Sequence, residues 1–350
     1  MNKIIISLIS LLSLAIILII LPYVSLTGYA VLENTQNAMT LGVMLPLTGP
    51  MAEKGSNIKN AIELAFRDAD LDNLKIVFED SRCDEKQAKI AVSRLIKINN
   101  VSAIIGDFCS NATLAASTLA EINKIVLISP ASTSSLISSA GEYTFRTAVS
   151  DSQKGELIAT VIYEDENRDL AILHDSNNLA LAEETKKNFE KLVAQVVFSG
   201  VLNEENIKNL KETRADSLYI INSQELSPNL IVSLNSLNPE IKIYVSEYAV
   251  NKDIRINREI KAISFANYQS SFIQEYTSEF NKQPEEFTAE AYDAFNALAL
   301  AIKQNSKSGS DIKNRLYLMN FPGASGPVSF DANGDRVPSY KIYTIDNSES

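Results

Sequence analysis

The sequence is poor in the side chains that most often carry enzymatic or metal chemistry. It contains one histidine, two cysteines and no tryptophan among 350 residues. The histidine, His174, ends an apolar segment, where we expect a loop or hinge contact rather than a general base. So few histidines and cysteines disfavour a zinc site, and no Gly-x-Ser-x-Gly nucleophile motif is present. The composition therefore predicts a protein that is not an enzyme, with no cofactor and no metal.

Runs of basic residues are also missing. The formal net charge is −11, and the acidic residues are spread along the chain. A surface of this sign repels polyanions, so we do not expect nucleic acid as a partner. Apolar residues make up 45% of the chain and charged residues 21%, which is typical of a globular protein. Because 350 residues exceed what one core usually serves, we expect two domains.

The N-terminus predicts export. Residues 4–21 form an apolar run interrupted only by three serines, and Lys3 is the only charge before Glu33. The run is either a signal peptide cut after Ala30 or, as we slightly prefer, a retained transmembrane anchor. No cysteine follows the run directly, which excludes a lipid anchor there. Either alternative places the rest of the chain in the periplasm or on the outer face of the cell.

The two cysteines, Cys83 and Cys109, are expected to form a disulfide if the chain is exported. The bridge would close a loop of roughly 27 residues and contribute about 3.5 kcal/mol in the chain-entropy model. The alternative is a pair of free buried thiols.

From residue 41 onwards, short apolar strands alternate with amphipathic helices. This alternation predicts an α/β fold with two doubly wound parallel sheets, one on each side of residues 145–151. The predicted strands are 41–47, 74–78, 101–105, 125–128, 170–173, 193–198, 217–221 and 241–245. The predicted helices between them are 58–69, 85–98, 113–122, 153–163, 181–192, 204–211 and 228–234. Three further helices (271–280, 287–304 and 312–317) precede two final strands (327–330 and 340–344), which flank a turn at 332–335.

Two loops rich in hydroxyl groups follow neighbouring predicted strands. One runs from Asp107 through Ser110 and Asn111 to Thr113, and the other covers residues 129–135. In parallel sheets, ligands bind beyond the carboxyl ends of the strands, and small polar loops at helix N-termini suit a carboxylate. Helix capping is the alternative for each loop alone. In the second half, Glu247 follows a strand end and could hold an ammonium group.

Several stretches resemble the periplasmic type I solute-binding family, specifically the branched-chain amino acid (Leu/Ile/Val) binding proteins of ABC transporters. The resemblance runs from about residue 40 to 344. It rests on Leu-Pro-Leu-Thr-Gly-Pro (45–50), Glu-Asp-Ser-Arg-Cys-Asp-Glu-Lys-Gln-Ala (79–88), Ile-Gly-Asp-Phe-Cys-Ser (105–110), Ile-Ser-Pro-Ala-Ser-Thr (128–133), Phe-Arg-Thr (145–147), Ala-Tyr-Asp (291–293) and Gly-Pro-Val-Ser-Phe-Asp (326–331).

The resemblance implies two lobes joined by three crossovers, near residues 145–151, 263–270 and 326–331. Lobe 1 would hold residues 40–147 and 268–325, and lobe 2 residues 148–267 and 326–346, after a signal peptide or anchor with its linker at 1–39. It also implies that Ser110 and the loop of Ala131 and Thr133 bind a ligand carboxylate. Glu247 would take the ammonium group, and the family's disulfide falls on Cys83 and Cys109.

The side-chain pocket departs from the family pattern. The family often has an aromatic residue in the first loop, at the position where this chain has Lys54. Two further positions that are aromatic in the family lack an aromatic side chain here. Lys54 is either a solvated loop lysine, which we favour, or a partner for an acidic or polar ligand side chain. We therefore expect an amino-acid-like ligand, delivered to ABC transporter permease subunits. The alternative is an extracellular sensor domain of the same fold.

Overall fold

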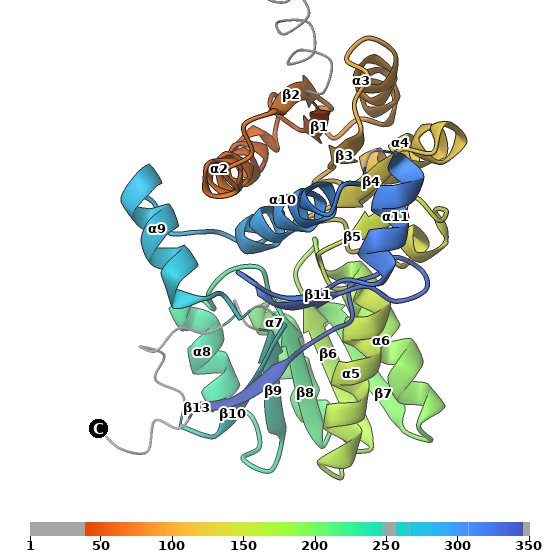
Figure 1. The fold of residues 1–350 in the computed structure, drawn as a ribbon. Helices are drawn as coiled ribbons and strands as arrows, with labels where there is room; N and C mark the ends of the chain where they lie inside the picture. Colours follow the sequence, from red (N-terminus) through yellow and green to blue (C-terminus); the bar gives the residue numbers. More distant parts are fainter. Residues whose placement is uncertain (1–38, 247–248, 250–256, 266, 307, 346–350) are drawn as a thin grey trace, which may run out of the picture.

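The computed structural model describes residues 39–246, 249, 257–265, 267–306 and 308–345. Within these residues the strands form two large sheets and one small hairpin (Figure 1). None of the described helices is long and apolar enough to cross a membrane. Residues 4–21, predicted to be a signal or an anchor, lie outside the described part of the chain.

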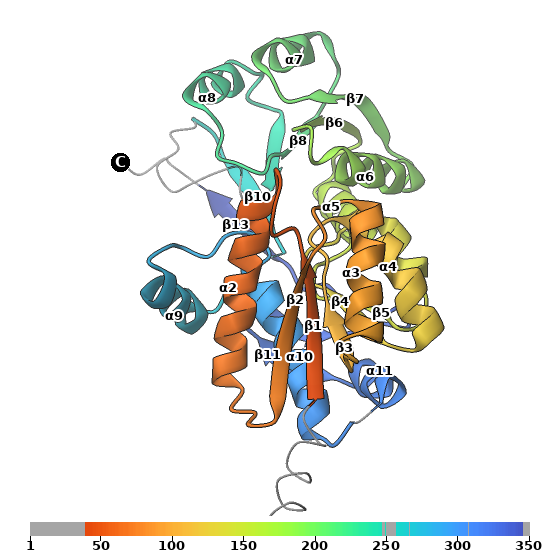
Figure 2. The ribbon, with the colours of Figure 1, turned by 90° about the horizontal axis from the view of Figure 1, so that it is seen from above.

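The first sheet is parallel, with the strand order β2-β1-β3-β4-β5. Helices α2, α9, α10 and α11 supply the core on one face, and α3 and α4 on the other. Figure 2 shows α2 and α3 on opposite sides of this sheet. The elements are β1 (Met39–Leu45), α2 (Ala52–Asp68), β2 (Leu74–Asp80), α3 (Glu85–Lys97), β3 (Ala103–Ile105), α4 (Ser110–Asn123), β4 (Val126–Ser129), η1 (Ser135–Ser139), β5 (Thr144–Arg146), α9 (Ser270–Phe280), α10 (Thr288–Lys303) and α11 (Gly309–Tyr317).

The second sheet has the order β13-β10-β9-β8-β6-β7, and only β13 runs antiparallel to its neighbour. Helices α5 and α6 cover one face, and α7 and α8 the other. The elements are α5 (Asp151–Glu164), β6 (Asp169–His174), α6 (Leu179–Lys191), β7 (Gln195–Val201), α7 (Glu204–Asn209), η2 (Leu210–Glu212), β8 (Ser217–Ile221), α8 (Pro228–Asn235), β9 (Lys242–Ser246), β10 (Ile260–Ser264) and β13 (Lys341–Ile345). Two such sheets confirm the predicted fold class.

The chain passes between the sheets three times, after β5, after β10 and before β13. Hydrogen bonds tie the first crossover to the third, and the second to the turn at residues 324–325, which precedes the third. The Arg336 guanidinium donates to the Thr147 carbonyl at 3.0 Å, and the Gln269 amide donates to the Ala324 carbonyl at 2.7 Å. Arg336 is only 1% exposed, so a buried cation ties the first crossover to the third.

In a simple hairpin the last two predicted strands would pair with each other, but here they do not. β12 (Gly326–Ser329) pairs with β11 (Asn320–Gly323), whereas β13 joins the second sheet beside β10. The turn between them is held elsewhere, because the Asp335 carboxylate forms a buried ion pair with Arg146 at 2.6 Å. That contact draws the turn onto the first sheet and sends the chain on to the second.

Helix α2 begins six residues before the predicted helix, which started at residue 58. The extra turns contain Gly55, which lies so close to β1 that an added Cβ would be 2.1 Å from the Pro46 carbonyl oxygen. Only glycine permits this approach of helix to strand end. As a consequence, Lys54 belongs to the first turn of a helix and not to a loop.

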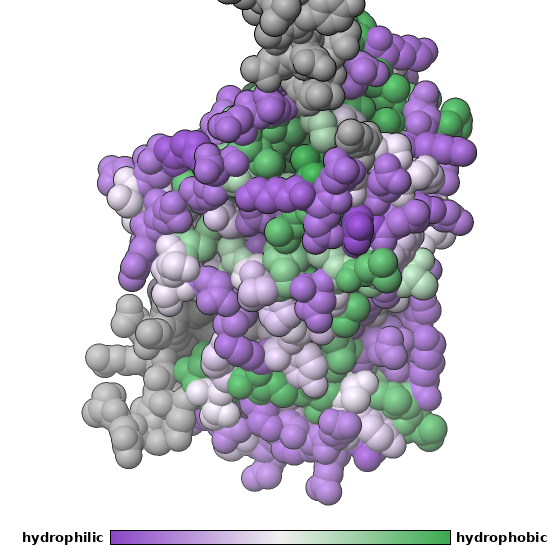
Figure 3. Space-filling view, in the orientation of Figure 1, coloured by the Kyte–Doolittle hydropathy of each residue, from purple (hydrophilic) through white to green (hydrophobic). Residues whose placement is uncertain are grey.

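The outer face drawn in Figure 3 is mostly hydrophilic, with apolar residues in small groups between charged and polar ones. Such a surface is ordinary for a globular protein. The apolar residues that the sequence periodicity indicated lie instead between the helices and the sheets.

Candidate ligand-binding site

The two hydroxyl-rich loops meet at the carboxyl edge of the first sheet. The Ser129 hydroxyl donates to the Asp107 carbonyl at 2.7 Å, and the Asp107 amide donates to Thr113 Oγ1 at 2.9 Å. Thr113 Oγ1 lies 2.7 Å from Ser132 Oγ, so these hydroxyls also bond each other. The four residues are buried. We call these loops, residues 106–113 and 129–135, the first loop cluster.

Ser110 is the first residue of α4 and is half-buried. Its Oγ accepts a hydrogen bond from the Ser134 amide at 3.4 Å, which places it against the second loop of the cluster. Cys109 occupies the N-cap position and gives no side-chain cap. The Cys109 side chain therefore leaves the first-turn amides of the helix without a cap, which favours an anion at this point, and the one nearby acid, Asp107, accepts only from the Cys109 amide.

The structure places the other predicted contacts around this helix end. Ala131 is buried, and its amide lies 3.3 Å from Ser129 Oγ. Thr133 accepts a hydrogen bond from the Asp151 amide at 2.8 Å, which links the first loop cluster to the start of α5. Asn111 is exposed and donates to the Cys83 carbonyl at 3.3 Å. Ser110, Ala131 and Thr133 thus share one neighbourhood, whereas Asn111 turns toward the disulfide loop.

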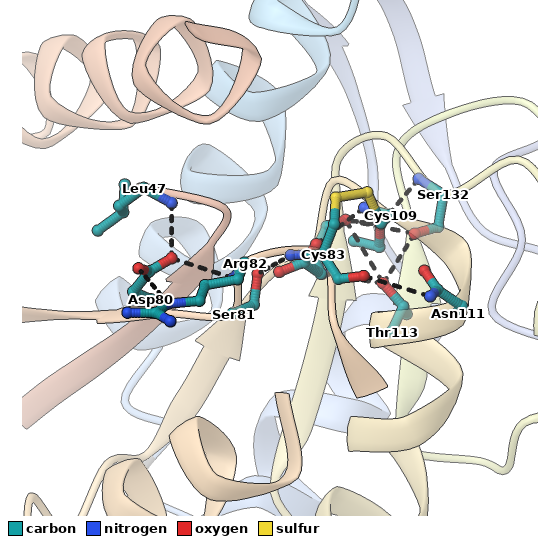
Figure 4. Close-up of a disulfide and its surroundings, with 11 residues drawn as sticks. Leu47, Asp80, Ser81, Arg82, Cys83, Cys109, Asn111, Thr113 and Ser132 are labelled. Carbon is teal, nitrogen blue, oxygen red and sulfur yellow. Dashed lines mark hydrogen bonds and ion pairs between the residues drawn. A yellow bond between two sulfur atoms is a disulfide. The ribbon is translucent and has the colours of Figure 1, made fainter. Parts of the chain in front are cut away.

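The predicted disulfide between Cys83 and Cys109 is present, with a Cα–Cα distance of 5.4 Å (Figure 4). It joins the loop after β2 to the N-terminus of α4. The alternative of two free thiols is wrong. The bridge therefore fixes the helix end on which Ser110 lies.

Asp107 is a buried acid of the first loop cluster that sequence reasoning did not single out. Its side chain is 0% exposed, and Oδ1 accepts from the Cys109 amide at 2.8 Å. Oδ2 has no hydrogen-bond partner among the described residues by geometry, although the nearby Ser81 hydroxyl favours the charged form. Burial dominates and raises the pKa of Asp107 to about 7. The raised pKa could not be predicted from the sequence, because Asp107 is buried between Ser81 and α4, two segments that are far apart in the chain.

The facing edge of the second sheet is organised by a carboxylate. Asp175 Oδ2 accepts from the Ser223 amide at 2.7 Å, and Oδ1 accepts from Asn178 Nδ2 at 2.9 Å. Burial raises the pKa of Asp175, but hydrogen bonds from Ser223 and Asn178 outweigh burial and hold this pKa below its usual range. His174 contacts the Asp175 carbonyl through Nδ1 at 2.8 Å, in line with the expected loop contact. Residues 174–178 and 221–223 form the second loop cluster.

Lys54 pairs with an acid that is far away in the sequence. Its Nζ lies 3.0 Å from Glu285 Oε2, and Lys282 Nζ lies 2.6 Å from Glu285 Oε1. Burial raises the pKa of Glu285, but hydrogen bonds from Lys282 and Lys54 outweigh it and lower the pKa overall. Lys54 is 42% exposed, so it is neither a buried cation nor a freely solvated one.

A cavity of about 550 Å³ lies beside this ion pair, between elements that pack on the two sheets. Its lining combines polar and apolar side chains, among them Lys54, Glu285, Glu286, Ser223, Ser264, Tyr268, Ile273 and Pro284. Its volume is within the range of small-molecule sites. Glu247, the predicted ammonium partner, lies outside the described residues.

Solved structures with a similar fold include leucine, amino acid and solute binding proteins. A leucine binding protein from Thermotoga maritima has a TM-score of 0.67 and 23% identity, covering 89% of this chain and 96% of its own. An isoleucine complex of a branched-chain amino acid transporter substrate binding protein from Streptococcus pneumoniae has a TM-score of 0.69 and 20% identity, covering 89% and 97%. A Rhodopseudomonas palustris solute binding protein with bound 3,4-dihydroxybenzoic acid has a TM-score of 0.70 and 19% identity, covering 87% and 92%. The fold is thus that of the type I periplasmic binding proteins, as the motifs predicted.

Sequence comparison then gives the family. Residues 57–348 match the model of the receptor family ligand binding region, and the chain belongs to that family. A relative named Leu/Ile/Val-binding protein homolog 1, from Brucella suis, is 25% identical over 340 residues, which cover 87% of this chain and 89% of the relative. The Leu/Ile/Val-binding protein of Citrobacter freundii is 30% identical over 195 residues, covering 51% of this chain and 53% of the relative.

Proposed function

We propose that this protein is an exported solute-binding protein that captures an amino acid or a related small polar ligand and delivers it to the permease subunits of an ABC transporter. The names of its relatives, Leu/Ile/Val-binding proteins, support this proposal. No catalytic role is proposed, since the sequence is poor in nucleophile and metal motifs. In this proposal the exported chain is either released after cleavage of a signal peptide or anchored in the membrane by residues 4–21.

The observation that carries the proposal is the first loop cluster at the N-terminus of α4. Its hydroxyl groups, the uncapped helix end and the adjoining disulfide suit a carboxylate. Ser110, Ala131 and Thr133 would hold that carboxylate, and Glu247 on the other lobe would hold the ammonium group. Asn111 would act at the rim, through its bond to the Cys83 carbonyl. Contacts from both lobes would favour the closed state and so drive closure.

The proposal divides the chain at residues 147–148, 267–268 and 325–326, so that lobe 1 comprises 40–147 with 268–325 and lobe 2 comprises 148–267 with 326–346. The buried bond from Arg336 to Thr147 would lie at the pivot of closure. In this proposal the two lobes close because the ligand contacts both of them.

The test is calorimetric titration of the purified chain with the twenty amino acids, in the wild type and in Ser110→Ala. We expect one amino acid to bind, and Ser110→Ala to weaken it by roughly tenfold, as the loss of one hydrogen bond to a charged group implies. Ser117→Ala is the matched control, because Ser117 lies in the same helix and donates to the Leu114 carbonyl. Absence of binding by any amino acid, or equal loss in both variants, would contradict the proposal.

A second candidate function is an extracellular sensor domain, which the family name, receptor family ligand binding region, favours. Genes for permease and ATPase subunits beside this gene would support transport. A neighbouring signalling gene, together with co-purification of its product, would support sensing.

A further inference from the structure

We propose that Asp107 couples ligand binding to a proton: the anion site at the N-terminus of α4 holds a ligand carboxylate when the Asp107 carboxyl is neutral, so that binding takes up a proton. This inference rests on the proposed function and identifies a buried residue that controls its anion site.

The Asp107 side chain lies at the helix end where the ligand anion is expected. Its Oδ1 accepts from the amide of Cys109, the N-cap residue of α4, at 2.8 Å, and Ser110 is the next residue. An ionised Asp107 therefore places a negative charge at the positive end of this helix. A ligand carboxylate at Ser110 would lie beside this buried like charge, and two carboxylates so placed disfavour each other's ionised form.

The Asp107 carboxyl is buried and short of hydrogen bonds. Its side chain is 0% exposed, and Oδ2 has no hydrogen-bond partner among the described residues. The equally buried Ser81 hydroxyl lies nearby, and its oxygen accepts from the Cys83 amide at 3.3 Å. Because a hydroxyl can donate to a carboxylate or accept from a carboxylic acid, the surroundings of Oδ2 accommodate either protonation state.

The elements packed around Asp107 bring few charges to it. The loop after β2 carries Asp80, Arg82 and Asp84 (Figure 4 labels the first two). Asp80 pairs with Arg82 at 3.6 Å, and Asp84 caps α3. The strands β1 and β3, the first turn of α4 and residues 129–135 contain no acidic or basic side chain. Burial is the largest cause that raises the pKa of Asp107 to about 7, and the Asp80 charge adds to it.

Like charges set the direction of the coupling. A ligand carboxylate at the helix end stabilises the neutral form of Asp107, and the neutral form stabilises the bound carboxylate to the same extent. If only the neutral form binds, a pKa of about 7 makes the affinity about tenfold lower at pH 8 than at pH 6. Binding at pH 7 then takes up about half a proton per ligand.

The experiment is calorimetric titration of the wild type with its tightest-binding amino acid at pH 6, 7 and 8, in phosphate and in imidazole buffer. The two buffers have different ionisation enthalpies, so the difference between the measured heats counts the protons taken up. We expect uptake of about half a proton at pH 7 and the loss of about tenfold in affinity by pH 8. Binding without proton uptake would overturn the inference and leave the proposed function intact. Binding by no amino acid at any of these pH values would overturn both.

Two variants assign the proton. Asp107→Asn keeps an acceptor for the Cys109 amide and carries no charge, so it should bind at pH 8 as tightly as the wild type does at pH 6, without proton uptake. Glu290→Gln is the matched control, because Glu290 is a second buried acid whose pKa is raised to about 7, but it lies on α10. This control should keep the wild-type uptake. Uptake that persists in Asp107→Asn and disappears in Glu290→Gln would assign the proton to Glu290 and overturn the inference.

An infrared measurement on the wild type keeps the test independent of how the variants fold. Saturating ligand at pH 7 should increase the carbonyl band of protonated carboxyl groups, since the fraction of neutral Asp107 rises. Bound ligand with no increase in this band would overturn the inference.

Discussion

The two loop clusters that face each other at the strand ends are built from opposite chemistry. The first is held by neutral hydroxyls, main-chain groups and a disulfide around Asp107 and Thr113. The second is held by one ionised carboxylate, Asp175, which collects donors from Ser223 and Asn178. The first presents the positive end of a helix, and the second presents a negative charge. If the chain binds a zwitterion, as we propose, this contrast would orient the ligand carboxylate toward the first cluster.

The clusters also differ in how firmly they are fixed. The first combines a covalent bridge with a buried ion pair, because Arg146 donates to the Ser134 carbonyl at 2.7 Å while it pairs with Asp335. The second has only hydrogen bonds at half-exposed positions. We infer that the first cluster is preorganised and that the second adapts when ligand arrives.

The largest expected effect comes from breaking the buried pair behind the first cluster. Asp335→Ala leaves the fully buried Arg146 without its partner, which should lower the free energy of unfolding by about 3–5 kcal/mol. Urea unfolding measures this. Glu142→Ala removes the exposed partner of Lys313 and should have little effect. Similar losses in both variants would show that the first cluster does not depend on this anchor.

Removing the disulfide should have the next largest effect. The double variant Cys83→Ser and Cys109→Ser should lose about 3.5 kcal/mol of unfolding free energy in the chain-entropy model. It should also bind ligand more weakly, because the N-terminus of α4 is no longer tied down. Reductant should reproduce both effects in the wild type and change nothing in the double variant. A reduced wild type with unaltered stability and affinity would refute a fixed first cluster.

A smaller effect should follow pH. Because the pKa of Asp107 is raised to about 7 in the folded state, above its ordinary value of 3.8, the folded state binds a proton that the unfolded state has lost. Stability should therefore rise as pH falls from above 7 toward 4, by about 1.4 kcal/mol between pH 8 and pH 6 for this group.

Asp107→Asn should remove that share of the pH dependence, measured by urea unfolding at pH 6 and pH 8. Glu290 contributes with the same sign, because burial raises its pKa to about 7 against the opposing charge of Arg336. The variant should therefore keep the portion due to Glu290. A pH dependence identical to that of the wild type would mean that Asp107 does not titrate in this range.

The smallest effect is expected on the second cluster. Asp175→Asn keeps an acceptor but removes the charge, which should cost about 1 kcal/mol of stability. The loss in the free energy of ligand binding should exceed this loss in the free energy of unfolding, because Ser223 lines the cavity. Thermal unfolding and calorimetry on the same sample separate the two effects. A loss as large as that of Asp335→Ala would abolish the contrast between the clusters.

Much of the secondary structure could be predicted because its signals are local. The strand at residues 217–221 has the predicted bounds, and α3 ends one residue before the predicted helix end. The strands that escaped prediction are short or atypical. β5 has three residues, β11 has the turn-like sequence Asn-Phe-Pro-Gly, and β10 has five residues, of which the last two overlap the predicted crossover at 263–270.

The sequence by itself determined the alternation of strands and helices, the two cysteines that pair and the two hydroxyl-rich loops. Periodicity, composition and turn residues act over a few positions, so they can be read along the chain. Only the tertiary structure decided that Lys54 meets Glu285, 231 residues away, and that Arg146 meets Asp335, 189 residues away. It also decided the burial that raises the pKa of Asp107. Charge partners and solvation depend on which distant segments pack together, and no local pattern encodes that choice.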